Sequence, residues 1–108
     1  MNNDHLASKE EVRKAASDPR VVFVDVRSDE EVSLKSLQRP YIHAPCVVTK
    51  CQKLEEEGEK LVPEKDVPIV VFCRSGRRAI KAKETLEGMG YTNVMNAGGI
   101  TDLDHLFE

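Results

Sequence analysis

The sequence is poor in the features that mark secreted or membrane-bound proteins. Its 108 residues include three cysteines, an odd number with no C-x-x-C pair, which fits a reducing compartment better than a disulfide framework. No apolar run approaches the roughly 20 residues that a membrane-spanning helix needs. The opening residues MNNDH have neither the basic start nor the apolar centre of a signal peptide. We therefore expect a cytoplasmic protein that does not bind membranes.

The chain also has little net charge. Its 16 Lys and Arg residues and 19 Asp and Glu residues give a net charge of −3. Basic side chains nevertheless gather in one short stretch, in which no acid appears before Glu84: Arg74, Arg77, Arg78, Lys81 and Lys83. A local cluster on a mildly acidic protein favours a small anionic ligand over a nucleic acid.

This cluster lies where an apolar strand is expected to turn sharply into a helix. Residues 67–72 are largely β-branched and apolar, which predicts a buried strand, and the apolar spacing from Ala79 to Met89 predicts an amphipathic helix. Backbone N–H groups and the helix dipole favour an anion at such a turn. Because a thiolate is the reactive form of cysteine, Cys73 is a candidate nucleophile there. The alternative is a structural cysteine followed by a solvated basic turn.

The remaining pattern alternates helices with strands. We expect helices at 8–18, 28–37, 49–57 and 101–107, and strands at 20–27, 46–48 and 93–96, with a tight bend at 97–99. This order predicts one α/β domain over 1–108, with its core at about 8–107, a mainly parallel central sheet and helices on both faces. Asp25, Cys73 and Asn96 would then meet at the carboxyl edge of the sheet.

Three motifs in order resemble the rhodanese family, and together they cover about residues 8–107. Asp25-Val26-Arg27 with Glu31 is similar to its early signature. Cys73-Arg74-Ser75-Gly76-Arg77-Arg78 resembles its active-site loop, and residues 90–99 resemble its carboxyl-terminal signature. Val32, residues 41–45 and Leu103 depart from the family pattern.

The resemblance implies a thiosulfate sulfurtransferase in which Cys73 carries a persulfide. The backbone of Arg74, Ser75, Gly76, Arg77 and Arg78 would hold the anionic sulfur, with Arg74 and Arg78 contacting the donor's oxygens. Asp25 and Arg27 would support the loop. The donor would be thiosulfate or another small anionic sulfur compound, and the acceptor a thiol such as thioredoxin or glutathione, or cyanide.

Two other functions use the same fold. A cysteine phosphatase or arsenate reductase would need its arginine at position 79, which is alanine here, whereas Arg78 comes one residue earlier. A non-catalytic binding module of the same fold is the other alternative, although such modules usually lose the cysteine or the loop's charge.

We expect neither a metal nor a cofactor. His43, Cys46 and Cys51 lie close in sequence, but their spacing matches no common zinc pattern. Cys46 is more typical of a small core residue, and Cys51 of a helix residue.

Overall fold

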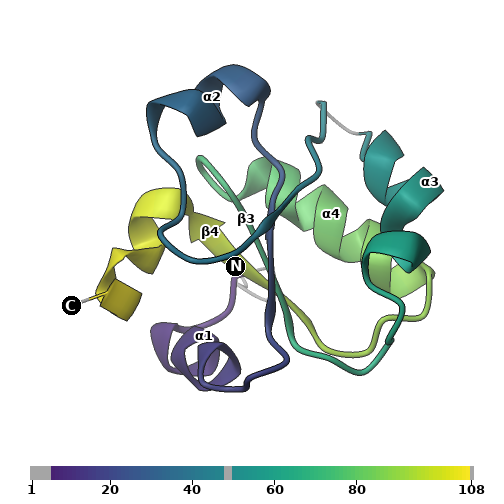
Figure 1. Cartoon of the computed structure of the whole chain (residues 1–108), viewed down its shortest axis with the longest axis horizontal. Coiled ribbons are helices and arrows are strands. Elements are labelled where there is room, and N and C mark those ends of the chain that lie inside the picture. The colour runs from purple at the N-terminus through teal and green to yellow at the C-terminus, as the bar shows by residue number, and fades with distance from the viewer. Residues whose placement is uncertain (1–5, 48–49, 108) are drawn as a thin grey trace, which may run out of the picture.

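A computed structural model describes residues 6–47 and 50–107 (Figure 1). Its centre is a four-stranded sheet in the order β2-β1-β3-β4, in which all neighbouring strands are parallel. The strands are β1 (Val22–Asp25), β2 (Ile42–His43), β3 (Ile69–Cys73) and β4 (Val94–Gly99). The predicted α/β class with a parallel sheet is confirmed.

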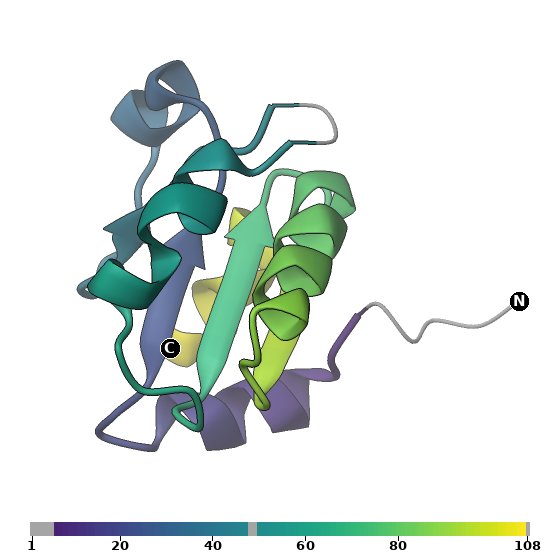
Figure 2. The same ribbon diagram turned by 90° about the vertical axis from the view of Figure 1, so that its right-hand side faces the viewer.

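Helices cover both faces of the sheet, as predicted. They are α1 (Lys9–Ala16), α2 (Asp29–Leu34), α3 (Gln52–Leu61), α4 (Arg77–Gly88) and the 3-10 helix η1 (Ile100–Phe107). In Figure 2, α3 and α4 lie in front of the strands and η1 lies behind them. Within the part of the chain described, no helix is both long enough and apolar enough to cross a membrane.

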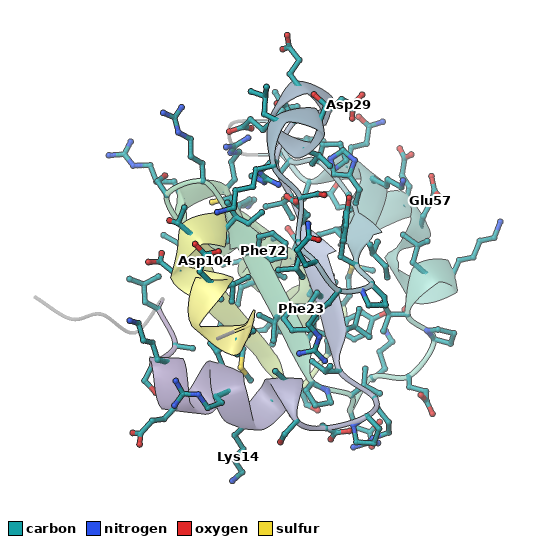
Figure 3. All side chains as sticks on the ribbon, turned by 60° about the vertical axis from the view of Figure 1, so that its left-hand side comes forward. Lys14, Phe23, Asp29, Glu57, Phe72 and Asp104 are labelled. Carbon is teal, nitrogen blue, oxygen red and sulfur yellow. A yellow bond between two sulfur atoms is a disulfide. The ribbon has the colours of Figure 1, made fainter. Side chains whose placement is uncertain are left out.

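The core has two halves because side chains alternate along the buried strand β3. Ile69, Val71 and Cys73 belong to the half beneath α3 and α4, whereas Val70 and Phe72 belong to the half beneath α1 and η1. All of β3 is buried, as expected for a central parallel strand. Figure 3 shows the labelled Phe72 and the neighbouring Phe23 inside the molecule.

Local capping explains where two of the helices begin. Ser8 and Ser28 each accept a hydrogen bond from the backbone N–H three residues later, and the glutamate there bonds back to the serine N–H. Ser8 with Glu11 and Ser28 with Glu31 therefore form capping boxes, at the starts of two of the expected helices. The second helix ends at Leu34 rather than Leu37.

The stretch between β1 and β3 differs from the prediction. The edge strand is at Ile42–His43 rather than at 46–48, where Val47 makes only an isolated bridge to Lys50. Positions 48 and 49 lie outside the described residues. The helix that follows extends to Leu61, and Gly58 lies inside it instead of ending it. A Cβ at Gly58 would stand 3.0 Å from the Met89 side chain, which packs there.

The structure at the glycines near the end of the chain, Gly98 and Gly99, also differs from the prediction. The expected bend at 97–99 is part of β4, which pairs Asn96 with Val71 and Gly99 with Cys73. Between these two pairs, β4 has one residue more than β3. This extra residue makes a β-bulge, in which Gly98 takes a φ of 88°. The closing helix exists, but it is a 3-10 helix.

Candidate functional site

The candidate site lies at the carboxyl edge of the sheet, as predicted. β1 ends at Asp25 and β3 ends at Cys73, while β4 brings Asn96 and Gly99 to the same edge. The chain then runs from β3 through a short turn into α4. We call residues 73–78 the Cys73 loop.

Cys73 is a free cysteine whose sulfur faces the backbone of its own loop. The residue is fully buried, and the Gly76 N–H donates a hydrogen bond to its Sγ at 2.9 Å. Gly76 caps α4 with a φ of 95°, a left-handed conformation that favours glycine. The first turn of α4 has no acidic residue, so its positive dipole end is available to a sulfur anion.

Strand β4 anchors the Cys73 loop from the side. The buried Asn96 amide donates from Nδ2 to the Gly76 carbonyl at 3.1 Å, and its Oδ1 accepts from the Gly98 N–H at 2.9 Å. Gly99 lies so close to the loop that a Cβ there would stand 3.0 Å from the Arg74 carbonyl carbon. The loop is therefore fixed by contacts between residues that are 20 or more positions apart in the sequence.

The three loop arginines lie in different environments. Arg74 and Arg77 are exposed, as is Ser75. Arg78 is partly buried and binds Glu31 with both ends of its guanidinium, at 2.7 and 3.0 Å. The Arg78 hydrogen bond holds the Glu31 pKa at about 2, and the same bond raises the pKa of Arg78.

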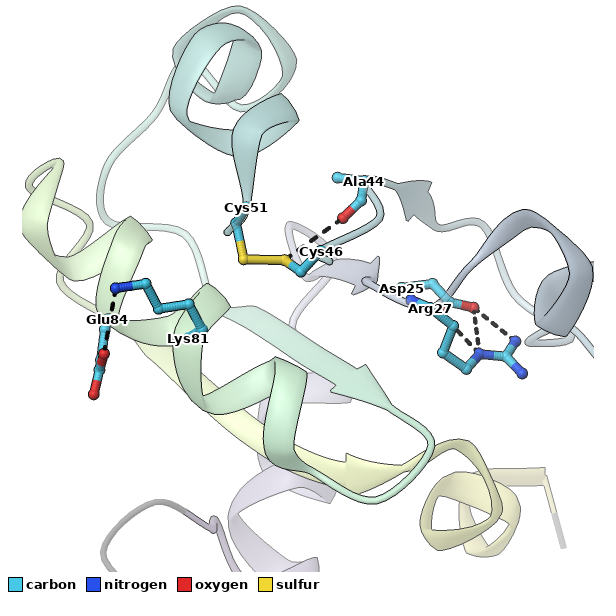
Figure 4. The surroundings of a disulfide bond; sticks show 7 residues. All are labelled: Asp25, Arg27, Ala44, Cys46, Cys51, Lys81 and Glu84. Carbon is cyan, nitrogen blue, oxygen red and sulfur yellow. Dashed lines mark hydrogen bonds and ion pairs between the residues drawn. A yellow bond between two sulfur atoms is a disulfide. The ribbon is translucent and has the colours of Figure 1, made fainter. Parts of the chain in front are cut away.

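Asp25 and Arg27 form a buried ion pair, with Arg27 Nη2 2.8 Å from the Asp25 carboxylate (Figure 4). Arg27 also donates to the backbone carbonyls of Glu31, in the first turn of α2, and of Lys35, which directly follows this helix. In the described part of the chain, the Asp25 side chain accepts its hydrogen bonds from Arg27. Its charge also helps to raise the pKa of Arg78 in the Cys73 loop, but the role of Asp25 in supporting that loop stays a prediction.

Comparison with known proteins agrees with this geometry. The Rhodanese-like domain family matches residues 8–104. The chain belongs to the rhodanese family. It is 36% identical to the thiosulfate sulfurtransferase PspE of Escherichia coli, over 75% of this chain and 72% of the relative. It is 31% identical to the rhodanese domain-containing protein CG4456 of Drosophila melanogaster, over 83% of this chain and 86% of the relative.

Solved structures lead to the same family. A rhodanese with anions from E. coli has a TM-score of 0.61 and 34% identity, covering 76% of this chain and 89% of that one. The human single-domain sulfurtransferase TSTD1 has a TM-score of 0.70, covering 94% of this chain and 96% of that one; its 24% identity supports the fold alone. Membership of the family supports sulfur transfer as the general activity of this rhodanese domain.

The cysteine prediction is wrong in two respects. Cys46 and Cys51 form a disulfide, beside which Figure 4 shows the carbonyl of Ala44. Two hydrogen bonds between Val47 and Lys50 turn the chain back on itself, so that cysteines five positions apart meet. Cys46 is buried as predicted, but Cys51 precedes α3 instead of lying in it.

The disulfide changes two arguments made from the sequence. It occupies both sulfur atoms that a metal site near His43 could have used. It also removes the reason for preferring a reducing compartment, because that preference rested on unpaired cysteines. The cytoplasmic location stays an untested prediction.

Reasoning from the sequence did not assign roles to Glu31 and Asn96. Glu31 appeared only as part of the early signature, yet its carboxylate completes a capping box with Ser28 and also binds Arg78. Asn96 was placed at the correct edge, but its bond to Gly76 was not foreseen. For Asn96 the available signal was an amide side chain at the end of a predicted strand, whereas Glu31 lies in the first turn of a predicted helix and had no such signal.

Proposed function

We propose that this rhodanese domain transfers a sulfane sulfur from a small anionic donor such as thiosulfate to a thiophilic acceptor, through a persulfide on Cys73. One observation carries the proposal. The Cys73 sulfur already accepts a hydrogen bond from a backbone N–H at the N-terminus of α4, beside exposed arginines. A thiolate, and the persulfide formed from it, would both be stabilised by such donors.

In the first half-reaction, the Cys73 thiolate attacks the outer sulfur of thiosulfate. A new S–S bond forms to Cys73, the S–S bond of thiosulfate breaks, and its electron pair leaves with sulfite. In the second half-reaction, cyanide or a thiolate attacks the outer sulfur of the persulfide. This breaks the bond to Cys73, so that the thiolate returns and the acceptor leaves as thiocyanate or as a persulfide.

The loop residues would have separate tasks in this reaction. The N–H of Gly76 would hold the sulfur anion, and the exposed Arg74 and Arg77 would meet the donor's charge. Ser75 is also exposed on the loop and can contact the donor. The sequence-based proposal that Arg78 contacts the donor's oxygens needs revision, because Glu31 already binds both ends of its guanidinium.

Intact-mass measurement tests the proposal directly. After incubation with thiosulfate and removal of excess donor, we expect the protein to gain one sulfur, about 32 Da. Cys73→Ser should show no gain. A matched control replaces both disulfide cysteines, Cys46→Ser with Cys51→Ser, which leaves no unpaired thiol besides Cys73 and should keep the gain. A folded wild type that gains no sulfur from thiosulfate or from a small persulfide would contradict the proposal.

The phosphatase alternative has less support once the contacts of Arg78 are considered than it had from the sequence alone. Besides the short spacing, the arginine that would have to bind phosphate is already paired with a carboxylate. We expect no hydrolysis of an aryl phosphate under conditions in which the persulfide forms.

A further inference from the structure

One arginine of the Cys73 loop, Arg78, is already paired with a carboxylate, that of Glu31. Each terminal nitrogen of Arg78 donates to a different oxygen of Glu31, a fork-to-fork arrangement that uses the same donors an oxyanion would bind. Both side chains are only about a quarter exposed, at 24% and 25%. The pair is thus partly shielded from water and joins α2 to the Cys73 loop across 47 residues of sequence.

Glu31 is held in place without help from Arg78. Its carboxylate accepts hydrogen bonds from the N–H and Oγ of Ser28 at 3.0 and 3.1 Å. Its backbone carbonyl accepts from Arg27, which the buried Asp25 fixes in turn. A glutamate carboxylate is ionised throughout the neutral range even at its ordinary pKa. Glu31 is therefore a fixed negative charge and not a mobile side chain that a donor could easily push aside.

The other two loop arginines differ from Arg78 in this respect. Arg74 and Arg77 are exposed, and among residues 6–47 and 50–107 neither forms an ion pair with a carboxylate. Their guanidinium groups can turn toward an incoming anion without first breaking an internal contact. The loop thus carries two available arginines and one that is already occupied.

We propose that Glu31 is a specificity-determining positioning residue, an internal carboxylate that occupies the donor face of Arg78 and leaves oxyanion recognition to Arg74 and Arg77. This inference rests on the proposed function and extends it to the choice of donor. Interactions that bind substrate and transition state equally do not accelerate the chemical step. A third free arginine would bind thiosulfate and the departing sulfite more tightly without a gain in turnover. Glu31 thus keeps the affinity of the site for oxyanions low enough that the site can release them.

The test is the affinity for inorganic sulfate, measured by isothermal titration calorimetry on the whole chain. Glu31→Gln preserves the capping box, since glutamine also serves at that position, but removes the charge that holds Arg78. We expect its sulfate Kd to fall roughly three- to tenfold. Glu30→Gln is the matched control, because Glu30 is exposed and the change in net charge is the same. It should bind sulfate as the wild type does.

A double variant shows whether the gain in sulfate affinity comes from Arg78. In Glu31→Gln with Arg78→Gln the net charge of the pair is unchanged, and we expect the sulfate Kd to return to the wild-type value. A double variant that binds sulfate clearly more weakly than the wild type would mean that Arg78 binds anions despite Glu31, and would overturn the proposal. So would a Glu31→Gln protein that binds sulfate no better than the Glu30→Gln control.

Kinetics with thiosulfate and cyanide supply a second readout. Glu31→Gln should lower the KM for thiosulfate without raising kcat, whereas a merely structural role would raise the KM through a loosened loop. Because sulfate binding needs no turnover, the calorimetry remains decisive if the wild type proves inactive with thiosulfate. A failure of the proposed function and a failure of this inference are thus distinguishable.

Discussion

Gly99→Ala tests how closely strand β4 fixes the Cys73 loop. A methyl group on Gly99 would stand 3.0 Å from the Arg74 carbonyl carbon and would overlap the carbonyl oxygen. Both atoms belong to the backbone, so no side-chain rotation relieves the contact. The Arg74 peptide must retreat by on the order of 1 Å to restore normal contact distances. Such overpacking typically costs about 1–3 kcal/mol of the free energy of unfolding.

Because Arg74 directly follows Cys73, the same displacement should move the Gly76 N–H that donates to the sulfur. A misplacement of about 1 Å in an active site can cost ~10²-fold in rate. We expect the melting temperature to fall by roughly 5–15 °C. We also expect the rate of sulfur transfer from thiosulfate to cyanide to fall at temperatures where the variant is fully folded.

Gly88→Ala is the matched control for this substitution. Gly88 is the last residue of α4, and a Cβ built there meets no atom within 4 Å. The same chemical change should therefore be neutral, or stabilising by up to ~1 kcal/mol, since alanine restricts the unfolded chain more than glycine does. If Gly99→Ala matches Gly88→Ala in both melting temperature and rate, the loop does not depend on close contact with β4.

Three further predictions concern the surroundings of the Cys73 loop. Asp25→Ala leaves the buried Arg27 without its counterion, and we expect urea unfolding to show a loss of about 3–5 kcal/mol; an unchanged midpoint would contradict the buried pair. Because folding lowers the Glu31 pKa from 4.5 to about 2, its contribution is complete above pH 4.5 and is lost as the pH falls toward 2. Wild type should therefore lose about 1–2 kcal/mol more than Glu31→Gln between pH 5 and pH 2 in denaturant titrations, and parallel curves would refute this. Alkylation of the unfolded, unreduced protein should label one cysteine, and reduction should expose all three; three labels without reductant would exclude the Cys46–Cys51 disulfide.

The elements that depend on neighbours within a few residues could be predicted from the sequence alone. The serine and glutamate of each capping box lie three positions apart, so the starts of α1 and α2 could be predicted. The apolar run before Cys73 and the glycine after it predicted a buried strand, a sharp turn and a helix, which together set the main geometry of the loop. The alternation of strands with helices then fixed the fold class and the edge at which the site lies.

Tertiary structure decided the contacts that join segments far apart in the sequence. Whether Arg78 is free or paired depends on where α2 packs, because Glu31 lies 47 residues before it. The glycines at the end of β4 carry no local signal that separates a bend from a bulged strand, and pairing with β3 made the choice. The Cys46–Cys51 disulfide required a turn that the sequence pattern did not reveal. Local rules act over about four residues, whereas register and packing depend on the whole sheet.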